Sequence, residues 1–307
     1  MAAGERLAGG PNMIGAAFDR ARLRRARPVP TEALGRGRAL GLDGGGYELR
    51  AWLGGAADAS LTVVVVPDPP NVLEHHVAQL DGLAASARVL GLELPGFGRS
   101  GVPADFDFTI ESYARTMSGA LDQHTDGPLL LVFSCLAGLI ATEIASRNER
   151  VVGLLLVQTP SLEDARGWAE RVDPGGLLAK PLLGQVIVRA ARRRLAKTWY
   201  DAALPRGTAR EPYLQSALEA YDAGADYCLA SAVQSLGSAA RVPTVGVPTT
   251  VLWGDSDRTH RPSDPTRLRP SIPGLRVRTV EGAGHFPDLE APEAFEAEAR
   301  ELRARVA

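Results

Sequence analysis

The sequence predicts an α/β protein in which a mostly parallel, roughly eight-stranded sheet is flanked by helices and carries a helical cap. Three observations support this fold class. Short runs of β-branched and other apolar residues, such as LTVVVV at 61–66, alternate with segments of helical spacing. Such runs are typical of strands buried on both faces. The strand pattern then stops between 160 and 242 and returns at Thr249.

The elements follow from the patterns in chain order. GRALGL and YELRAWL flank a GGG turn and predict a β-hairpin. Further strands are expected at 61–66, 87–94, 128–133, 151–159, 249–254 and 276–280, and helices from 72, at 111–124, at 136–147 and from 292 onward. The chain is therefore expected to divide into an N-terminal extension (1–30), a core (31–159 and 243–307) and a helical cap (160–242) inserted late in the core.

Composition limits the classes of function. The formal net charge is −2, so no strong field draws the protein to nucleic acid or to a membrane surface. No apolar run reaches the roughly 18 residues of a membrane span. The N-terminus has no apolar stretch typical of a secretion signal. Two cysteines in 307 residues need no disulfide framework, so a cytoplasmic protein is expected. Neither a cofactor nor a metal is implied.

The segment LLLVFSCLAGLIATEIA predicts a strand, a tight turn and a helix, which is the setting of a nucleophile elbow. It resembles the L-V-G-H-S-x-G-G-L-I-A segment of the α/β-hydrolase superfamily, in its capped haloperoxidase- and esterase-like members. The resemblance places Cys135 on the nucleophilic serine, and Phe133 and Ala137 on the two small residues that let the turn close. It implies an α/β-hydrolase fold with cysteine in place of serine.

Three further segments agree with this resemblance. LELPGFGRS at 92–100 resembles the family's D-L-P-G-x-G-x-S loop. VLWGDSD at 251–257 resembles the W-G-x-x-D strand end and places Asp257 on the acid. GAGHFPDLEAPEAF at 282–295 resembles the segment of the catalytic histidine and makes His285 the base. The order nucleophile, acid, histidine is the one this fold uses. An adjacent imidazole and a helix N-terminus are both expected to lower the pKa of the Cys135 thiol.

Two rival residues stand beside the predicted triad. Ser134 is the alternative nucleophile, although it would leave Leu136 where a small residue is wanted. Asp255 is the alternative acid, although the W-G-x-x-D spacing favours Asp257. Cys228 has no catalytic sequence context.

The loop after the 61–66 strand departs from the family. Relatives have H-G-x-P there, and the backbone N–H of x is an oxyanion donor. This chain reads VPDPPN, so Pro69 replaces that donor and has no N–H. The candidate residues of the oxyanion region are the amide of Leu136, Asn71 as a substitute donor, and Asp68, Pro69 and Ser134 as its surroundings.

Candidate substrate contacts lie outside these motifs. His75 and His76 begin the helix after the same loop, and Trp168 belongs to the aromatic residues of the predicted cap. The run RAARRRLAK at 189–197 is interpreted as a solvated helix face or as a docking site for an acidic carrier or a phosphate-bearing substrate.

Three functions remain open. The first is hydrolysis or transfer of an ester or thioester of a small molecule through an acyl-cysteine. Its substrate is free or linked to a carrier protein or CoA, and the arginine-rich, lysine-poor composition of a GC-rich genome favours natural-product metabolism. The second is a lyase or cyclase with His285 as base, as in hydrolase-like enzymes that eliminate acetate from acetylated tetronates. The third is a non-catalytic binding protein.

Overall fold

The computed structural model describes residues 13–23, 28–239 and 241–306. Nine strands form its main sheet in the order β1-β2-β3-β5-β4-β7-β8-β10-β11. Their bounds are β1 (Glu32–Leu34), β2 (Gly37–Asp43), β3 (Glu48–Gly54), β4 (Thr62–Val66), β5 (Arg88–Leu92), β7 (Leu129–Ser134), β8 (Val151–Val157), β10 (Thr249–Gly254) and β11 (Arg276–Val280). The six strands from β5 to β11 in this order are parallel, and the first three are antiparallel.

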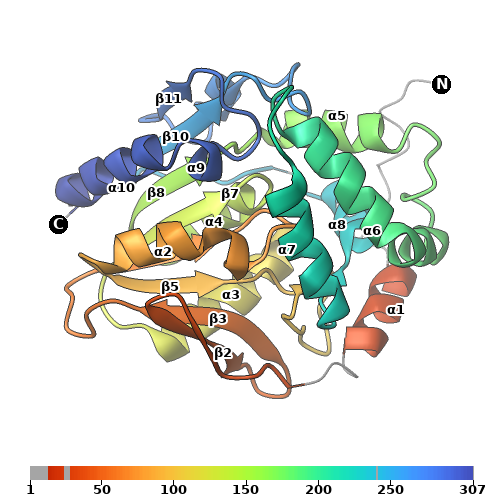
Figure 1. Ribbon diagram of the computed structural model, residues 1–307, viewed down its shortest axis with the longest axis horizontal. Helices are drawn as coiled ribbons and strands as arrows, with labels where there is room; N and C mark the ends of the chain where they lie inside the picture. The colour runs from red at the N-terminus through yellow and green to blue at the C-terminus, as the bar shows by residue number, and fades with distance from the viewer. Residues whose placement is uncertain (1–12, 24–27, 240, 307) are drawn as a thin grey trace.

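Helices cover both faces of this sheet (Figure 1). Their bounds are α1 (Met13–Leu23), α2 (Val77–Ala84), α3 (Ile110–His124), α4 (Ala137–Ala145), α5 (Leu162–Val172), α6 (Leu183–Ala203), α7 (Glu211–Asp222), α8 (Leu229–Leu236), α9 (Pro287–Glu290) and α10 (Pro292–Val306), with 3-10 turns η2 (Leu73–His76) and η3 (Pro265–Leu268). Helices α3 and α4 pack together on one face, and α2 and α10 pack together on the other.

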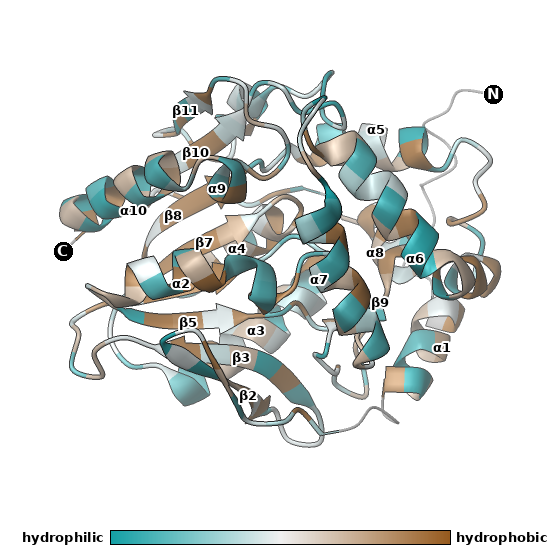
Figure 2. Ribbon diagram, viewed as in Figure 1, coloured by the Kyte–Doolittle hydropathy of each residue, from teal (hydrophilic) through white to brown (hydrophobic). Residues whose placement is uncertain are grey.

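The alternation of side chains along the central strands explains the two layers. In β4, Val64 and Val66 belong to one buried apolar cluster, while Val63 and Val65 belong to the other. Because both faces of the strand are covered, every residue of β4 is buried. The strands β7 and β8 accordingly stand out as hydrophobic in the middle of Figure 2.

The predicted strands are confirmed, with differences in detail. The hairpin pairs β2 with β3, and Asp43 lies opposite Glu48 across the turn. A short additional strand, β1, adds to the edge of β2, so the sheet has nine strands rather than about eight. This strand, Glu32–Leu34, forms by backbone pairing with β2, and its sequence has no alternation of apolar residues from which it could be predicted.

The segment between β8 and β10 folds into α5, α6, α7 and α8, which Figure 1 shows grouped with α1 at the right of the view. We expected no strand in this segment, and that prediction is wrong in one place. Residues Asp226–Tyr227 form β9, which pairs with β6 (Phe97–Gly98) in a separate two-stranded sheet. A two-residue pairing leaves no periodic pattern in the sequence. The division into extension, core and cap remains our proposal, and part of the extension lies outside the described residues.

Among the described residues, no helix has the length and apolarity needed to cross a membrane. The carboxyl ends of β4, β7, β8 and β10 are neighbours in the parallel part of the sheet. In open α/β sheets the ligand site lies in the crevice outside these ends. The residues that follow these four strands are therefore the place to look for a functional site.

Candidate active site

Cys135 sits in a tight turn between β7 and α4. Its backbone has φ of +51°, a left-handed conformation that is strained for a residue with a side chain. The Cys135 N–H donates to the carbonyl of Val157 on the neighbouring strand at 2.7 Å, which fixes the turn to β8. The turn closes although Phe133 replaces a small residue, because the Phe133 ring is fully buried in the apolar core.

The expectation that the pKa of the Cys135 thiol is lowered is wrong, because the surroundings of the thiol raise it. Burial and then the charge of Asp68 raise the pKa of the thiol to about 12, although His285 and the Leu136 amide act to lower it. The imidazole and the helix N-terminus are local features of the sequence, whereas burial and the nearby carboxylate arise only in the folded chain. The resting thiol is therefore protonated.

Asp257 contacts His285 as predicted. Its Oδ2 atom lies 2.7 Å from His285 Nδ1. The other oxygen, Oδ1, accepts hydrogen bonds from the N–H and the hydroxyl of Thr259, both at 2.7 Å. Burial would raise the pKa of Asp257, but the charge of His285 and its hydrogen bond hold that pKa well below the ordinary value. The rival Asp255 instead accepts from the N–H of Gly282 at 2.9 Å and is exposed.

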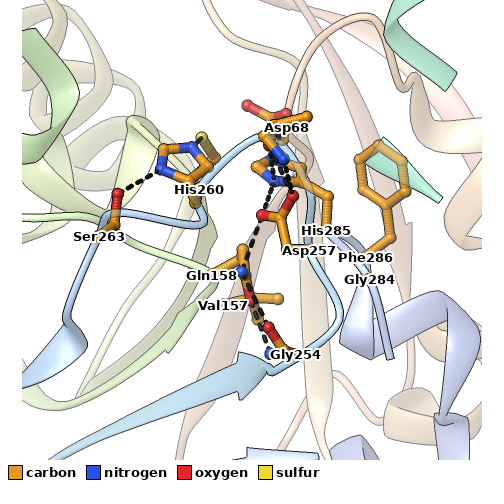
Figure 3. A network of polar contacts seen from close by, with 12 residues as sticks. Asp68, Val157, Gln158, Gly254, Asp257, His260, Ser263, Gly284, His285 and Phe286 are labelled. Carbon is orange, nitrogen blue, oxygen red and sulfur yellow. Dashed lines mark hydrogen bonds and ion pairs between the residues drawn. The ribbon is translucent and has the colours of Figure 1, made fainter. Parts of the chain in front are cut away.

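Gln158 is a functional candidate that the sequence analysis missed. It follows β8 with φ of +47°, and its Nε2 donates to Asp257 Oδ2 at 2.9 Å (Figure 3). Its Oε1 accepts from the N–H of Gly254 at 2.7 Å. The same glycine has no room for a side chain, because a Cβ there would collide with the carbonyl of Gly284. Gln158 thus ties Asp257 to the end of β10, beside the loop that carries His285. Its only sequence signal is its place after a buried strand.

The second imidazole nitrogen of His285 faces a carboxylate as well. Asp68 Oδ2 lies 3.3 Å from His285 Nε2, and Asp68 also makes a side-chain hydrogen bond with Cys135. Burial raises the pKa of Asp68, while its bonds to His285 and Cys135 oppose this change. Burial disfavours charge on His285 too, but its charged neighbours, Asp257 above all, raise its pKa well above the ordinary value. His285 thus contacts a carboxyl group at each ring nitrogen, and its Nε2 is placed to share a proton with Asp68.

The oxyanion region has one backbone donor of the two usual ones. Pro69 lines the pocket and has no N–H. The N–H of Asn71 is donated to the carbonyl of Asp68 at 2.9 Å, and Asn71 Oδ1 accepts from the hydroxyl of Tyr200 at 2.7 Å. The backbone amide of Asn71 is therefore already used within the turn, and Asn71 as a substitute donor stays a prediction. The Leu136 amide hydrogen-bonds the Cys135 thiol and remains at the site.

His260 also enters the site, although the sequence analysis did not select it. Its Nε2 lies 4.0 Å from Cys135 Sγ, and its Nδ1 lies 3.0 Å from the hydroxyl of Ser263. The ring stacks on that of His285, with centroids 5.3 Å apart. Burial, followed by the charge of His285, lowers the pKa of His260 to about 3, so the ring is neutral. Its position three residues after Asp257 is the signal that could have identified it.

The candidate substrate contacts divide into two groups. His75 Nε2 lies 2.8 Å from the carbonyl of Tyr213, and His76 Nε2 lies 3.0 Å from Asp288 Oδ2. Neither histidine lines the pocket beside Cys135, because both rings are turned toward these protein partners. Trp168 does line it. Ser134, the rival nucleophile, is buried at the end of β7 and is not among the pocket residues.

A cavity of about 80 Å³ opens beside the Cys135 thiol. Apolar and aromatic side chains form most of its wall. The lining residues are Asp68, Pro69, Leu94, Phe97, Tyr113, Cys135, Leu136, Ala137, Ile140, Trp168, Trp199, Tyr227, Leu229 and Ala232. The polar groups gather at the Cys135 end, so the cavity fits an apolar group whose reacting centre lies next to the thiol.

Comparisons with known proteins agree with this geometry. A sequence model of the alpha/beta hydrolase family matches residues 44–298. A 2-hydroxy-6-oxononadienedioate/2-hydroxy-6-oxononatrienedioate hydrolase from Cupriavidus pinatubonensis is 24% identical over 221 residues, which cover 69% of this chain and 75% of that protein.

Two solved structures share the fold. Epoxide hydrolase A from Mycobacterium thermoresistibile superposes with a TM-score of 0.71 at 14% identity, over 87% of this chain and 98% of that chain. A thermophilic esterase from Thermogutta terrifontis gives a TM-score of 0.64 at 23% identity, over 87% of this chain and 97% of that chain.

Proposed function

Because the chain belongs to the alpha/beta hydrolase family, and is an enzyme of that family, we propose that it hydrolyses or transfers the acyl group of a small-molecule ester or thioester through Cys135. In this proposal Cys135 is the nucleophile, His285 the proton-transfer group and Asp257 the acid. The observation that carries the proposal is the strained turn at Cys135, with φ of +51°, beside an imidazole held by Asp257 at 2.7 Å.

The protonated thiol determines the first step. As Sγ bonds to the acyl carbon, the thiol proton passes to the cluster of His285 and Asp68, which both contact Cys135. The Leu136 amide donates to the developing oxyanion. His285 then returns a proton to the leaving alcohol or thiol as the carbon–oxygen or carbon–sulfur bond breaks. Water or an acceptor hydroxyl finally attacks the acyl-cysteine and regenerates the thiol.

Asp68 takes a role that a backbone amide has in relatives. Its position after β4, beside Pro69, is where the second oxyanion donor would lie. When the shared proton resides on Asp68, the neutral carboxyl group donates a hydrogen bond toward the pocket, and His285 Nε2 is free to accept the thiol proton. A neutral carboxylic acid acts as an oxyanion donor in ketosteroid isomerase. This role compensates for the missing N–H of Pro69.

A second candidate function rests on the same contact. Because Asp68 lies 3.3 Å from His285 Nε2, the pair is also suited to remove a proton from carbon and to protonate a leaving carboxylate. An elimination, such as loss of acetate from an acetylated tetronate-type intermediate, or a cyclisation, needs no tetrahedral oxyanion. The single backbone donor at the site favours this alternative. Cys135 would then only contribute packing.

The substrate is proposed to be an apolar small molecule of natural-product metabolism. The aromatic wall of the cavity, with Trp168, Trp199 and Tyr227, favours an apolar acyl or ring group. A larger groove of about 870 Å³ lies beside α6; four arginines (22, 99, 189 and 192) and two aspartates (222 and 226) are among its lining residues. It supports a substrate attached to a carrier protein or CoA, because guanidinium groups bind phosphate. We retain the cytoplasm as the proposed location.

Intact-mass analysis separates the two functions. Wild-type protein, Cys135→Ala and the matched control Cys228→Ala are mixed with activated esters, thioesters and an acetylated tetronate. The acyl-cysteine proposal expects an added acyl mass in the wild type and in Cys228→Ala, and none in Cys135→Ala. Elimination without any adduct, with Cys135→Ala within roughly 10-fold of the wild-type rate, would establish the alternative instead.

A further inference from the structure

We propose that Cys135, His260 and His285 form a Zn²⁺-binding site at the carboxyl edge of the sheet. The cluster goes beyond the triad, because His260 has no part in the proposed acyl transfer. Among the described residues, Cys135, His260 and His285 form a buried group whose ligand atoms all lie within 4.8 Å of one another. Asp68 is not part of this group, although its Oδ2 lies 3.3 Å from His285 Nε2.

The distances in the cluster approach those of a tetrahedral site. Cys135 Sγ lies 4.0 Å from His260 Nε2, and Asp68 Oδ2 lies 3.3 Å from His285 Nε2. Asp68 and Cys135 are also in hydrogen-bond contact. Zinc bonds of the usual length, arranged tetrahedrally, place neighbouring ligand atoms about 3.3–3.6 Å apart. Because the ligand atoms of Cys135, His260 and His285 lie within 4.8 Å of one another, a contraction of at most about 1.5 Å brings these three atoms to that spacing.

At known zinc sites, the ring nitrogen of a histidine that does not bind the metal is hydrogen-bonded to another group. The Nδ1 atoms of His285 and His260 already have such partners. His285 donates its Nδ1 proton to Asp257 at 2.7 Å, and His260 Nδ1 lies 3.0 Å from Ser263 Oγ. Figure 3 shows these two contacts on the sides of the rings away from the cluster. Both bonds leave the Nε2 atoms for the metal and fix the ring orientations in advance.

The chemistry of the three ligands favours zinc. A thiolate and two imidazoles are ligands that Zn²⁺ accepts in tetrahedral sites, whereas Mg²⁺ and Ca²⁺ require oxygen ligands. The indole rings of Trp168 and Trp199 pack against His260 and His285 and keep the cluster buried. The ion would enter through the cavity that reaches Cys135 and Asp68. The thiol proton leaves to solvent as the zinc–sulfur bond forms.

An ion bound to these three ligands would block the site. Zinc would occupy the thiol and the imidazole nitrogen on which acyl transfer depends. The protein would then be a reversibly zinc-inhibited enzyme. This inhibitory consequence rests on the proposed function, whereas the metal binding itself does not.

Zinc binding is measured by competition with a chromogenic chelator, starting from wild-type protein stripped of metal. We expect one equivalent of Zn²⁺ with a submicromolar dissociation constant. His260→Ala should weaken binding by at least about 100-fold, and Ser263→Ala, which removes an outer partner, by roughly 10-fold. Cys228→Ala is the matched control, because Cys228 is the other buried cysteine and lies outside the cluster; its zinc affinity should equal that of the wild type.

Cobalt substitution reports the geometry directly. Co²⁺ in this site should show the intense visible bands of tetrahedral coordination, together with a thiolate-to-cobalt charge-transfer band that Cys135→Ala abolishes. Binding no tighter than micromolar, or equal binding by wild type and His260→Ala, would overturn the proposal. Ser263→Ala keeps the test decisive if His260→Ala fails to fold. The acyl-enzyme experiment is run on metal-free protein, so failure of the acyl-transfer proposal is seen separately.

Discussion

Replacing Gln158 by methionine tests whether this residue positions the acid. The side chain is fully buried, and its two shortest hydrogen bonds join it to Asp257 Oδ2 at 2.9 Å and to the N–H of Gly254 at 2.7 Å. Methionine keeps the volume and, like glutamine, has a β-carbon at the positive φ. The substitution therefore removes the hydrogen bonds and little else.

The expected loss follows from these two bonds. A hydrogen bond to a charged carboxylate contributes about 1.5–3 kcal/mol, and a buried N–H left without an acceptor costs about 1–3 kcal/mol. Because both losses occur at one side chain, we expect a combined loss of about 3 kcal/mol in the free energy of unfolding. At about 2.1 cal/mol/K per residue, this corresponds to a melting temperature about 5 °C lower for a chain of this length. Looser positioning of Asp257 should also lower kcat by roughly 10-fold.

Thermal unfolding followed by circular dichroism, together with steady-state kinetics, provides the measurement. Gln215→Met is the matched control, because Gln215 also donates to a carboxylate, that of Glu219 at 2.7 Å, but on the exposed face of α7. That variant should remain within about 0.5 kcal/mol of the wild type. If Gln158→Met were as stable and as active as Gln215→Met, the positioning role of Gln158 would be refuted.

The other predictions concern the triad and the buried charges. Cys135→Ala should lower acyl turnover by several orders of magnitude, measured by steady-state kinetics; a fully active variant would exclude Cys135 as nucleophile. Asp257→Asn should lower kcat strongly while the exposed Asp255→Asn retains it, and the reverse order would assign the acid to Asp255. Arg50→Met should lower the free energy of unfolding in urea by about 3–5 kcal/mol, because the buried Glu93 loses its partner at 3.0 Å. Equal stability of wild type and variant would contradict this account.

The sequence by itself determined the fold and the order of the motifs. Strands such as 61–66 are continuous apolar runs because both of their faces are buried, so every residue of the run must be compatible with burial. Cys135 lies at the predicted turn for a similar reason: the strand before it and the helix after it are both local patterns. The spacing of the W-G-x-x-D motif alone favoured Asp257 over Asp255. The two residues are only two positions apart in the turn, but the Asp257 side chain contacts His285 and the Asp255 side chain contacts Gly282 instead.

Only the tertiary structure decided how the site is charged and which residues complete it. Asp68, Gln158 and His260 come from three different strand ends, and their approach to His285 and Asp257 depends on the order of the strands in the sheet. The pKa of Cys135 is a further case, because burial and a carboxylate distant in sequence outweigh the neighbouring amide. Burial and long-range charge are properties of the folded chain, so no local pattern records them.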